Sequence, residues 1–211
     1  MTAALPARSA RKREAIMSAG RELFLSKGYR GTSVDEIAAL AVVSKQTVYK
    51  HFGDKRELLE AIVSAAMNTA VQPFVQRIAA LADSDDVHRD LATLAADYLR
   101  SVLAEPVVQL RRLVIGQANA LPELALTYYR QAPAQTLQAL ATAFGKLDER
   151  GLLSISDGDS AAIHFASLAV GHWIDRALFF GGPATLEGLD VEGHARAVAD
   201  AFLVIYQRRH R

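Results

Sequence analysis

The stretch SKQTVYKHF, residues 44–52, decides how the beginning of this 211-residue chain folds. Its length suits a helix of about two and a half turns, and a helix this short needs packing partners to persist in water. Val48 and Phe52 are four residues apart, so they share one helical face, which we expect to be buried. The side chains that point the other way are polar or basic: Lys45, Gln46, Tyr49 and Lys50.

The residues around this stretch predict where the short helix and its neighbour begin and end. Ser44 is a suitable N-cap and Gly53 a suitable terminator. Ser33 and Glu36 form the capping-box pattern that starts another short helix. Two short helices joined by a turn of about three residues and braced by a longer one form a helix-turn-helix, whose second helix can enter the major groove of DNA.

The charge of the chain is unevenly distributed. Residues 1–56 hold 11 Lys and Arg against 5 Asp and Glu, a net +6, whereas the remainder holds 13 against 18, a net −5. A basic beginning joined to an acidic remainder indicates a polyanion-binding module attached to a part that does not bind polyanions. A solvated charged tail is the plainer alternative.

The outer face of the short helix has the chemistry that DNA recognition requires. Gln46 can bond an adenine edge with two hydrogen bonds, Lys45 can reach guanine acceptors or a phosphate, and the Thr47 methyl can touch a thymine methyl. Hydroxyl and ammonium groups nearby suit phosphate oxygens, as do backbone amides at helix starts. A purely solvated polar surface is the alternative. The predicted DNA-binding residues are Thr32, Ser33, Ser44, Lys45, Gln46, Thr47, Tyr49, Lys50, His51 and Lys55.

Helical periodicity runs through nearly the whole chain, and no segment alternates with the period of two that strands require. The predicted fold class is therefore all-α, with a three-helix DNA-binding domain over residues 1–56 and a larger helical domain over residues 57–211. The fourth helix is expected to bend or end near Pro73, because proline removes an amide donor. The expected helices cover about 9–27, 33–41, 44–53, 54 to near 73, 86–104, 106–119, 122–150, 159–180 and 190–208.

Composition and motifs argue against several other classes of protein. There is no cysteine, which removes disulfides, thiol catalysis and cysteine-ligated zinc. The first residues lack the apolar core of a secretory signal. The longest uncharged apolar run, 160–174, is shorter than the roughly 20 residues of a membrane helix. We expect a cytoplasmic protein with no membrane contact.

An enzyme is the first rival interpretation. Helical bundles that hold two iron ions need Glu-x-x-His motifs, and none is present; the nearest patterns pair Asp85 with His88 and His172 with Asp175. No Gly-x-Ser-x-Gly elbow or phosphate-binding glycine loop occurs. The sequence therefore predicts no catalytic residue, metal or cofactor. A helical protein that uses its basic region on a membrane or an acidic partner is the second rival.

Several spaced elements between Phe24 and Leu59 agree with one known family. They are Gly28 followed by an aromatic residue, Gly31-Thr32-Ser33, Ile37-Ala38, Ser44, the Tyr49-x-x-Phe52 pair, and Lys55 followed by Leu58-Leu59. This stretch resembles the N-terminal DNA-binding domain of the TetR family of bacterial transcriptional repressors. The resemblance implies that Tyr49 and Lys55 hold phosphates and that residues 45–47 read bases. It covers roughly the first quarter of the chain.

Beyond that quarter the resemblance is weaker. It consists of overall length, a total of about nine helices and a segment, RRLVIGQANALPEL, that is similar to the sixth helix of some members. The family implies a homodimer whose last two helices, here 159–180 and 190–208, form a four-helix interface. Apolar residues on more than one face of these helices agree with that arrangement. Two-fold symmetry predicts a palindromic operator, and the resemblance implies repression.

The larger domain is expected to bind a small, mostly apolar effector that releases the protein from its operator. A ligand site is usually an apolar cavity with a few polar groups. The candidate lining residues are aromatic and polar residues on helices that are expected to converge, although any one residue of this kind is more often an ordinary core residue than a ligand contact. They are Tyr98, Leu113, Gln117, Tyr128, Phe144, His172 and Trp173.

Overall fold

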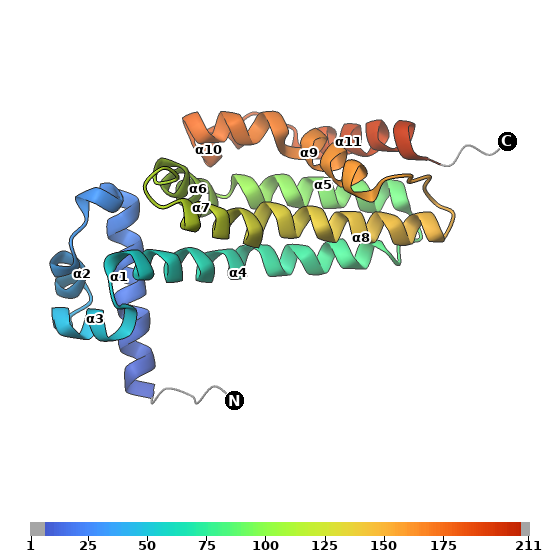
Figure 1. Ribbon diagram of the computed structural model, residues 1–211. Coiled ribbons are helices and arrows are strands. Elements are labelled where there is room, and N and C mark those ends of the chain that lie inside the picture. The colour runs from blue at the N-terminus through green and yellow to red at the C-terminus, as the bar shows by residue number, and fades with distance from the viewer. Residues whose placement is uncertain (1–6, 208–211) are drawn as a thin grey trace. The chain divides into compact units, whose positions relative to one another are not determined.

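A computed structural model describes residues 7–207, and Figure 1 shows the arrangement of their helices. The described residues form no strand; one isolated bridge joins Leu153 to Gln207. The all-α prediction is therefore confirmed. The chain forms two compact units: the first extends to Ala66 and includes Leu113–Thr127, and the second begins at Met67 and contains the rest. The expected division after residue 56 differs from this one.

The N-terminal part of the first unit contains three helices and the start of a fourth, in the order predicted. They are α1 (Ala7–Gly31), α2 (Val34–Leu40), α3 (Lys45–Phe52) and α4 (Lys55–Leu81). At Gly20 the side chains of α4 pack closely on α1, since a Cβ there would meet the Ile62 side chain at 3.0 Å. The buried core of this part includes Ile16, Phe24, Ile37, Val48, Phe52, Leu58, Leu59, Ile62 and Val63.

The predicted break after the first helix is present at Gly28. Its φ of 73° is positive, which suits glycine because it lacks a Cβ. One more helical turn follows the break and ends at Gly31, so α1 is longer than the expected 9–27. The capping box of α2 is also confirmed, with the Ser33 side chain accepting from the Glu36 amide.

The fourth helix does not end at Pro73 as expected; α4 continues to Leu81. Proline inside a helix costs about 3 kcal/mol. The helix after it buries Phe74, Ile78 and Leu81, and three such side chains contribute together about 5–9 kcal/mol. The expected end at Pro73 was wrong because core packing outweighs the missing hydrogen bond.

Helix α4 is also long and apolar enough to cross a membrane. Its buried side chains, however, recur at helical spacing, from Met67 through Val71 and Phe74 to Ile78, while Arg77 is exposed. This is the pattern of a helix that buries one face in the core of a helical protein.

The second unit is built around four helices that pack on one another. They are α5 (Val87–Leu103), α8 (Gln135–Glu149), α9 (Gly158–Phe180) and α11 (Val191–Tyr206). At their centre Phe144, Phe165 and Phe202 are fully buried with ring centroids 4.8–5.6 Å apart. Mutual packing of aromatic rings in edge-on and tilted geometries stabilises such a core beyond simple burial.

The remaining helices depart from the expected set in two places. The single helix expected over 122–150 is divided into α7 (Pro122–Tyr129), a π-helical segment η1 (Arg130–Ala134) and α8. Pro133 lies in η1, and wider turns of this kind accommodate irregularities in a helix. A short helix, α10 (Gly182–Leu186), forms where a loop was expected, whereas α6 (Glu105–Gly116) begins near Pro106 as predicted.

The turn between α2 and α3 contains a residue in an unfavourable backbone conformation. Val42 has a φ of 54° and is 89% exposed. Its amide donates to the Ala39 carbonyl and the Val43 amide to the Ala38 carbonyl, which closes the end of α2. The left-handed conformation costs a residue other than glycine about 1–2 kcal/mol.

We expect Val42→Gly to stabilise the protein by about 0.5–1 kcal/mol, because the relief of this strain exceeds the about 0.5–1 kcal/mol of chain entropy that glycine loses. Urea denaturation followed by circular dichroism measures the change. Val43→Gly is the control and is expected to destabilise, since Val43 is partly buried and has no positive φ. A Val42→Gly variant less stable than the parent would contradict this account.

Candidate DNA-binding surface and effector pocket

Helix α3 is held from one side, as its sequence predicts. Val48 is 1% exposed and Phe52 5% exposed. The Arg13 guanidinium of α1 lies over the Phe52 ring, 5.0 Å from its centroid. At the helix ends the Ser44 side chain accepts from the Thr47 amide, and Gly53 takes a φ of 64°. Both predicted caps are therefore confirmed.

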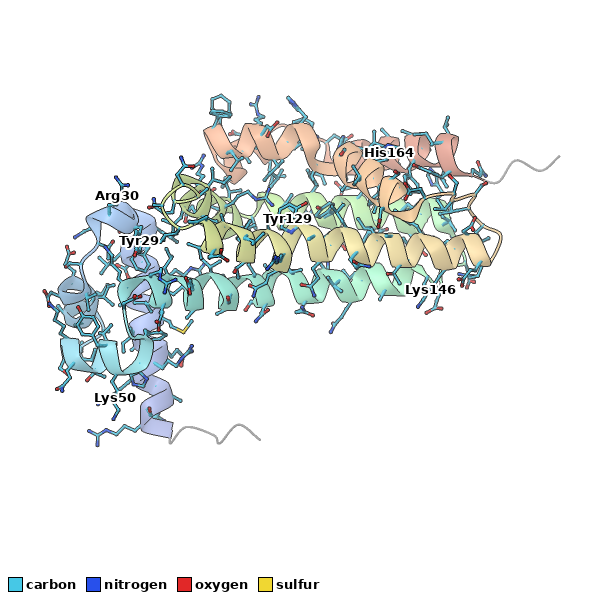
Figure 2. The ribbon with its side chains drawn as sticks, in the orientation of Figure 1. Tyr29, Arg30, Lys50, Tyr129, Lys146 and His164 are labelled. Atoms are coloured by element: carbon cyan, nitrogen blue, oxygen red, sulfur yellow. The ribbon has the colours of Figure 1, made fainter. Side chains whose placement is uncertain are left out.

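The outer face of α3 is open to solvent and carries no acidic residue. Gln46 and Lys50 are exposed, and Tyr49 is 43% exposed. Figure 2 shows Lys50 directed away from the helices. Lys45 is also exposed, but its ammonium pairs with Asp35 of α2 at 2.9 Å. Because such surface pairs are worth about 0.2–1 kcal/mol, a phosphate or base can replace this partner.

Other residues predicted to touch DNA contribute chiefly to local structure. The hydroxyls of Ser44 and Thr47 lie 2.8 Å apart, so the Thr47 hydroxyl belongs to the cap and its methyl remains available. His51 is partly buried, with its ring centroid 6.2 Å from that of Phe52. Thr32 is 2% exposed, and its hydroxyl donates to the carbonyls of Leu23 and Gly28.

The start of α2 is occupied by a carboxylate. The Ser33 amide donates to Glu36 Oε2 at 2.8 Å, and Lys27 pairs with Glu36 Oε1 at 2.6 Å. The hydrogen bond from Lys27, followed by those from Ser33, lowers the pKa of Glu36 to about 2. A predicted phosphate contact by the Ser33 amide therefore requires the Glu36 side chain to move.

Lys55 joins the end of α1 to the start of α4. Its ammonium donates to the carbonyls of Tyr29 at 3.0 Å and Thr32 at 2.8 Å. It also lies 4.4 Å from the centroid of the Tyr29 ring. Two of its three protons are thus held by carbonyls that follow the Gly28 break, so Lys55 is a structural clamp with one remaining donor for a phosphate.

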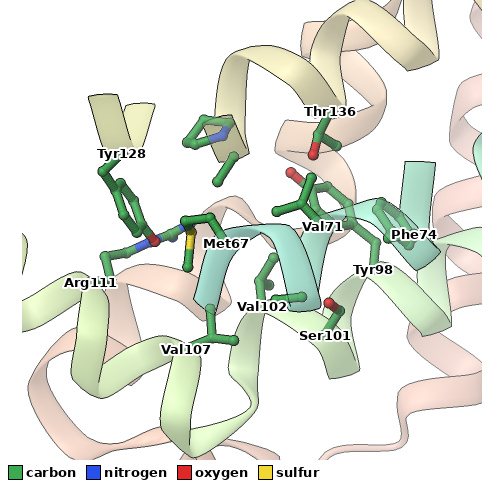
Figure 3. Close-up of a pocket in the computed structure, with 13 residues that line it drawn as sticks. Met67, Val71, Phe74, Tyr98, Ser101, Val102, Val107, Arg111, Tyr128 and Thr136 are labelled. Carbon is green, nitrogen blue, oxygen red and sulfur yellow. The ribbon is translucent and has the colours of Figure 1, made fainter. Parts of the chain in front are cut away.

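A pocket in the second unit brings together residues of α4, α5, α6, α7, η1 and α8 (Figure 3). It leaves about 40 Å³ of free volume, room for one or two water molecules. At one end the Arg111 Nε donates to the Tyr128 hydroxyl at 3.0 Å. At the other the rings of Phe74 and Tyr98 stack with centroids 4.9 Å apart. The remaining lining residues are Met67, Ala70, Val71, Ser101, Val102, Val107, Ala132, Pro133 and Thr136.

Among the predicted ligand residues, Tyr98 and Tyr128 line this pocket. Phe144 instead lies in the aromatic core, and Trp173 donates to the His194 ring. His172 is exposed, whereas Leu113 and Gln117 belong to the first unit. The sequence analysis did not identify Arg111, Phe74 or Thr136 as lining residues. For Arg111 the reason is that an arginine on an amphipathic helix is normally exposed to solvent.

Two family models match the chain. The model described as bacterial regulatory proteins, tetR family, matches residues 16–62, and that described as AefR-like transcriptional repressor, C-terminal domain, matches residues 89–208. The chain belongs to the TetR family. Its resemblance to that family is therefore confirmed, and the members it resembles are transcriptional regulators rather than enzymes.

Individual regulators resemble the chain along most of its length. A structure of a TetR-family regulator from Mesorhizobium loti MAFF303099 is 34% identical with a TM-score of 0.87, and the match covers 96% of this chain and 100% of that one. The flavonoid-responsive regulator FrrA is 25% identical with a TM-score of 0.75, over 95% and 100% of the two chains. The regulator YvkB of Bacillus subtilis is 26% identical over 164 residues, 76% of this chain and 80% of that protein.

We expect Lys55→Met to destabilise this TetR-family protein by about 1–3 kcal/mol, because two carbonyls lose a charged donor. Lys50→Met is the matched control; its side chain is exposed, so stability should change by no more than about 0.5 kcal/mol. Urea denaturation followed by circular dichroism compares the two variants. Equal stability of both would show that the Lys55 contacts contribute nothing to the fold.

Proposed function

We propose that this TetR-family regulator is a cytoplasmic repressor that binds a palindromic operator as a homodimer and is released by a small organic effector. The observation that carries the DNA-binding proposal is the exposed, acid-free outer face of α3, which its buried Val48 and Phe52 hold rigidly. The family model over residues 89–208, described as that of a repressor, supports repression rather than activation.

The predicted DNA-binding residues differ in whether their side chains are free to contact DNA. Gln46, Lys50 and Tyr49 have exposed side chains without internal partners among the described residues. Gln46 is proposed to read a base, and the other two to hold phosphates. Lys45 joins them by exchanging Asp35 for a nucleic-acid acceptor, and Thr47 offers its methyl group. Thr32, Ser33, Ser44, His51 and Lys55 position this surface and contribute through their backbone or a single remaining donor.

The proposed dimer interface lies on α9 and α11. Several large apolar side chains of these helices are exposed although the second unit already has a complete core. An apolar surface of this kind marks a site of protein association, and a second copy of the chain fits the two-fold symmetry of a palindromic operator. The exposed residues are Ile163, Leu168, Phe179, Phe180, Val204 and Ile205.

The pocket of the second unit is the proposed effector site. A ligand of ordinary drug size needs about 300–1,000 Å³, far more than the about 40 Å³ that is free. An effector must therefore displace the walls, so it binds an expanded state more tightly than this one and shifts the protein towards it. The name of the related FrrA, a flavonoid-responsive regulator, is consistent with a small organic effector.

We expect selection from a random DNA pool to yield a palindromic sequence, whose affinity falls with salt at a log-log slope of about −5 to −7. Gln46→Ala should weaken binding by about 1–3 kcal/mol and relax one base position. Lys50→Met should weaken all sequences alike and reduce the slope by about 2, one charge per subunit. Fluorescence anisotropy measures these quantities.

The control for the DNA experiment is Lys146→Met, which removes the same charge from the exposed surface of the second unit. It should leave operator affinity unchanged. An asymmetric selected sequence, or affinity that does not depend on Gln46 and Lys50, would contradict the proposed mode of binding and favour the non-DNA interaction protein.

We expect Ile163→Glu and Val204→Glu each to weaken dimerisation by at least about 100-fold, since a charge would have to be buried in an apolar interface. Ile115→Glu is the control, because Ile115 is 56% exposed and lies outside α9 and α11. Sedimentation velocity over a range of concentrations distinguishes monomer from dimer. Dimers that persist in both α9 and α11 variants would place the interface elsewhere.

A further inference from the structure

The pocket has one charged side chain among its lining residues. That residue is Arg111, and no aspartate or glutamate lines the pocket with it. Arg111 is partly buried and forms no ion pair within the described part of the chain. A cation that is partly withdrawn from water without an anionic partner loses part of its hydration, so this position favours a ligand that supplies a negative charge.

The hydrogen bond made by Arg111 leaves its two terminal nitrogens unused. The Nε donates to Tyr128, and the guanidinium lies 6.0 Å from the centroid of the Tyr128 ring. No described residue accepts a hydrogen bond from the terminal nitrogens. A guanidinium held at Nε in this way presents parallel donors that match the two oxygens of a carboxylate. The neighbouring Arg112, in contrast, is fixed by the carbonyls of Ala177 and Leu178.

The far end of the pocket is suited to an apolar ring. Phe74 and Tyr98 form a nearly parallel stack, with 16° between their planes, and Figure 3 shows Val71 near Tyr98. In Figure 3 Arg111 and Tyr128 occupy one end and the stacked pair the other. Burial raises the pKa of Tyr98, so its hydroxyl stays protonated and serves as a neutral donor.

We propose that the effector is a small aromatic oxyanion whose carboxylate binds Arg111 and whose ring enters between Phe74 and the opposite wall. This inference rests on the proposed effector site and narrows the expectation of a mostly apolar effector. Tyr128 orients the guanidinium, and the hydroxyls of Tyr98 and Thr136 lie beside the apolar part of the effector. An uncharged analogue of the same shape would leave Arg111 without a partner and bind more weakly.

A panel of aryl-alkanoic acids of increasing chain length, each paired with its neutral amide, tests the proposal by isothermal titration calorimetry at neutral pH. On the full-length parent protein the best acid should bind at least about 10-fold more tightly than its amide. In Arg111→Met the affinity for that acid should fall by about 10- to 100-fold, whereas the affinity for the amide should change by less than about 3-fold.

Two further variants distinguish a specific contact between Arg111 and the carboxylate from a general effect of charge and from a loss of folding. Arg111→Lys keeps the charge but not the paired donors, so its loss should be intermediate. Arg130→Met removes an exposed arginine that does not line the pocket and should leave the ratio of acid to amide affinity unchanged. Circular dichroism of each variant verifies that the fold is intact.

The possible outcomes distinguish this inference from the proposed effector site. If acids and amides bind the parent protein equally well, the proposal of an oxyanion effector is wrong, although the pocket can still be the effector site. The same conclusion follows if Arg111→Met lowers the affinities for acid and amide equally. An effect of Arg130→Met equal to that of Arg111→Met would also overturn that proposal. If no compound of either class binds, the oxyanion and the effector site are both wrong, while the DNA experiments still stand on their own.

Discussion

The packing of α3 through Val48 and Phe52 is the contact on which the proposed DNA-binding surface depends. An eight-residue helix does not persist alone, so every side chain it exposes is positioned by those two buried residues. The caps at Ser44 and Gly53 fix its length. Because the inner face needs only two side chains, most of the remaining surface of α3 is available for recognition, and its geometry is set by the rigid core beneath it.

The basic side chains of this protein have two distinct roles, which amino-acid composition alone does not distinguish. Lys55 and Arg112 hold backbone carbonyls and so join separate helices. Lys50 and Arg111 have no acidic partner among the described residues, one on an exposed helix face and the other inside a pocket. A net charge describes all four equally, whereas the partners within reach decide which of them remains available to an external anion.

The second unit combines a rigid core with a small pocket bordered by irregular backbone. The phenylalanines packed edge-on and tilted hold α8, α9 and α11 together, while Pro133 in η1 lines the pocket. The free volume is too small for a drug-sized ligand, so binding at the proposed effector site requires the wall to move. A pocket bordered by a π-helical segment can change shape without unfolding the core, which is the property that an effector-controlled regulator needs.

The sequence by itself determined the all-α class, the caps at Ser33 and Ser44, and the two faces of α3, because these follow from contacts within a few residues of the chain. It did not predict the continuation of α4 past Pro73, the clamp at Lys55 or the exposure of Val42 in a left-handed conformation. No sequence pattern indicated that Arg111 lines a pocket. These features depend on partners distant in sequence, and only the tertiary structure brings such partners within the few ångströms over which packing and hydrogen bonds act.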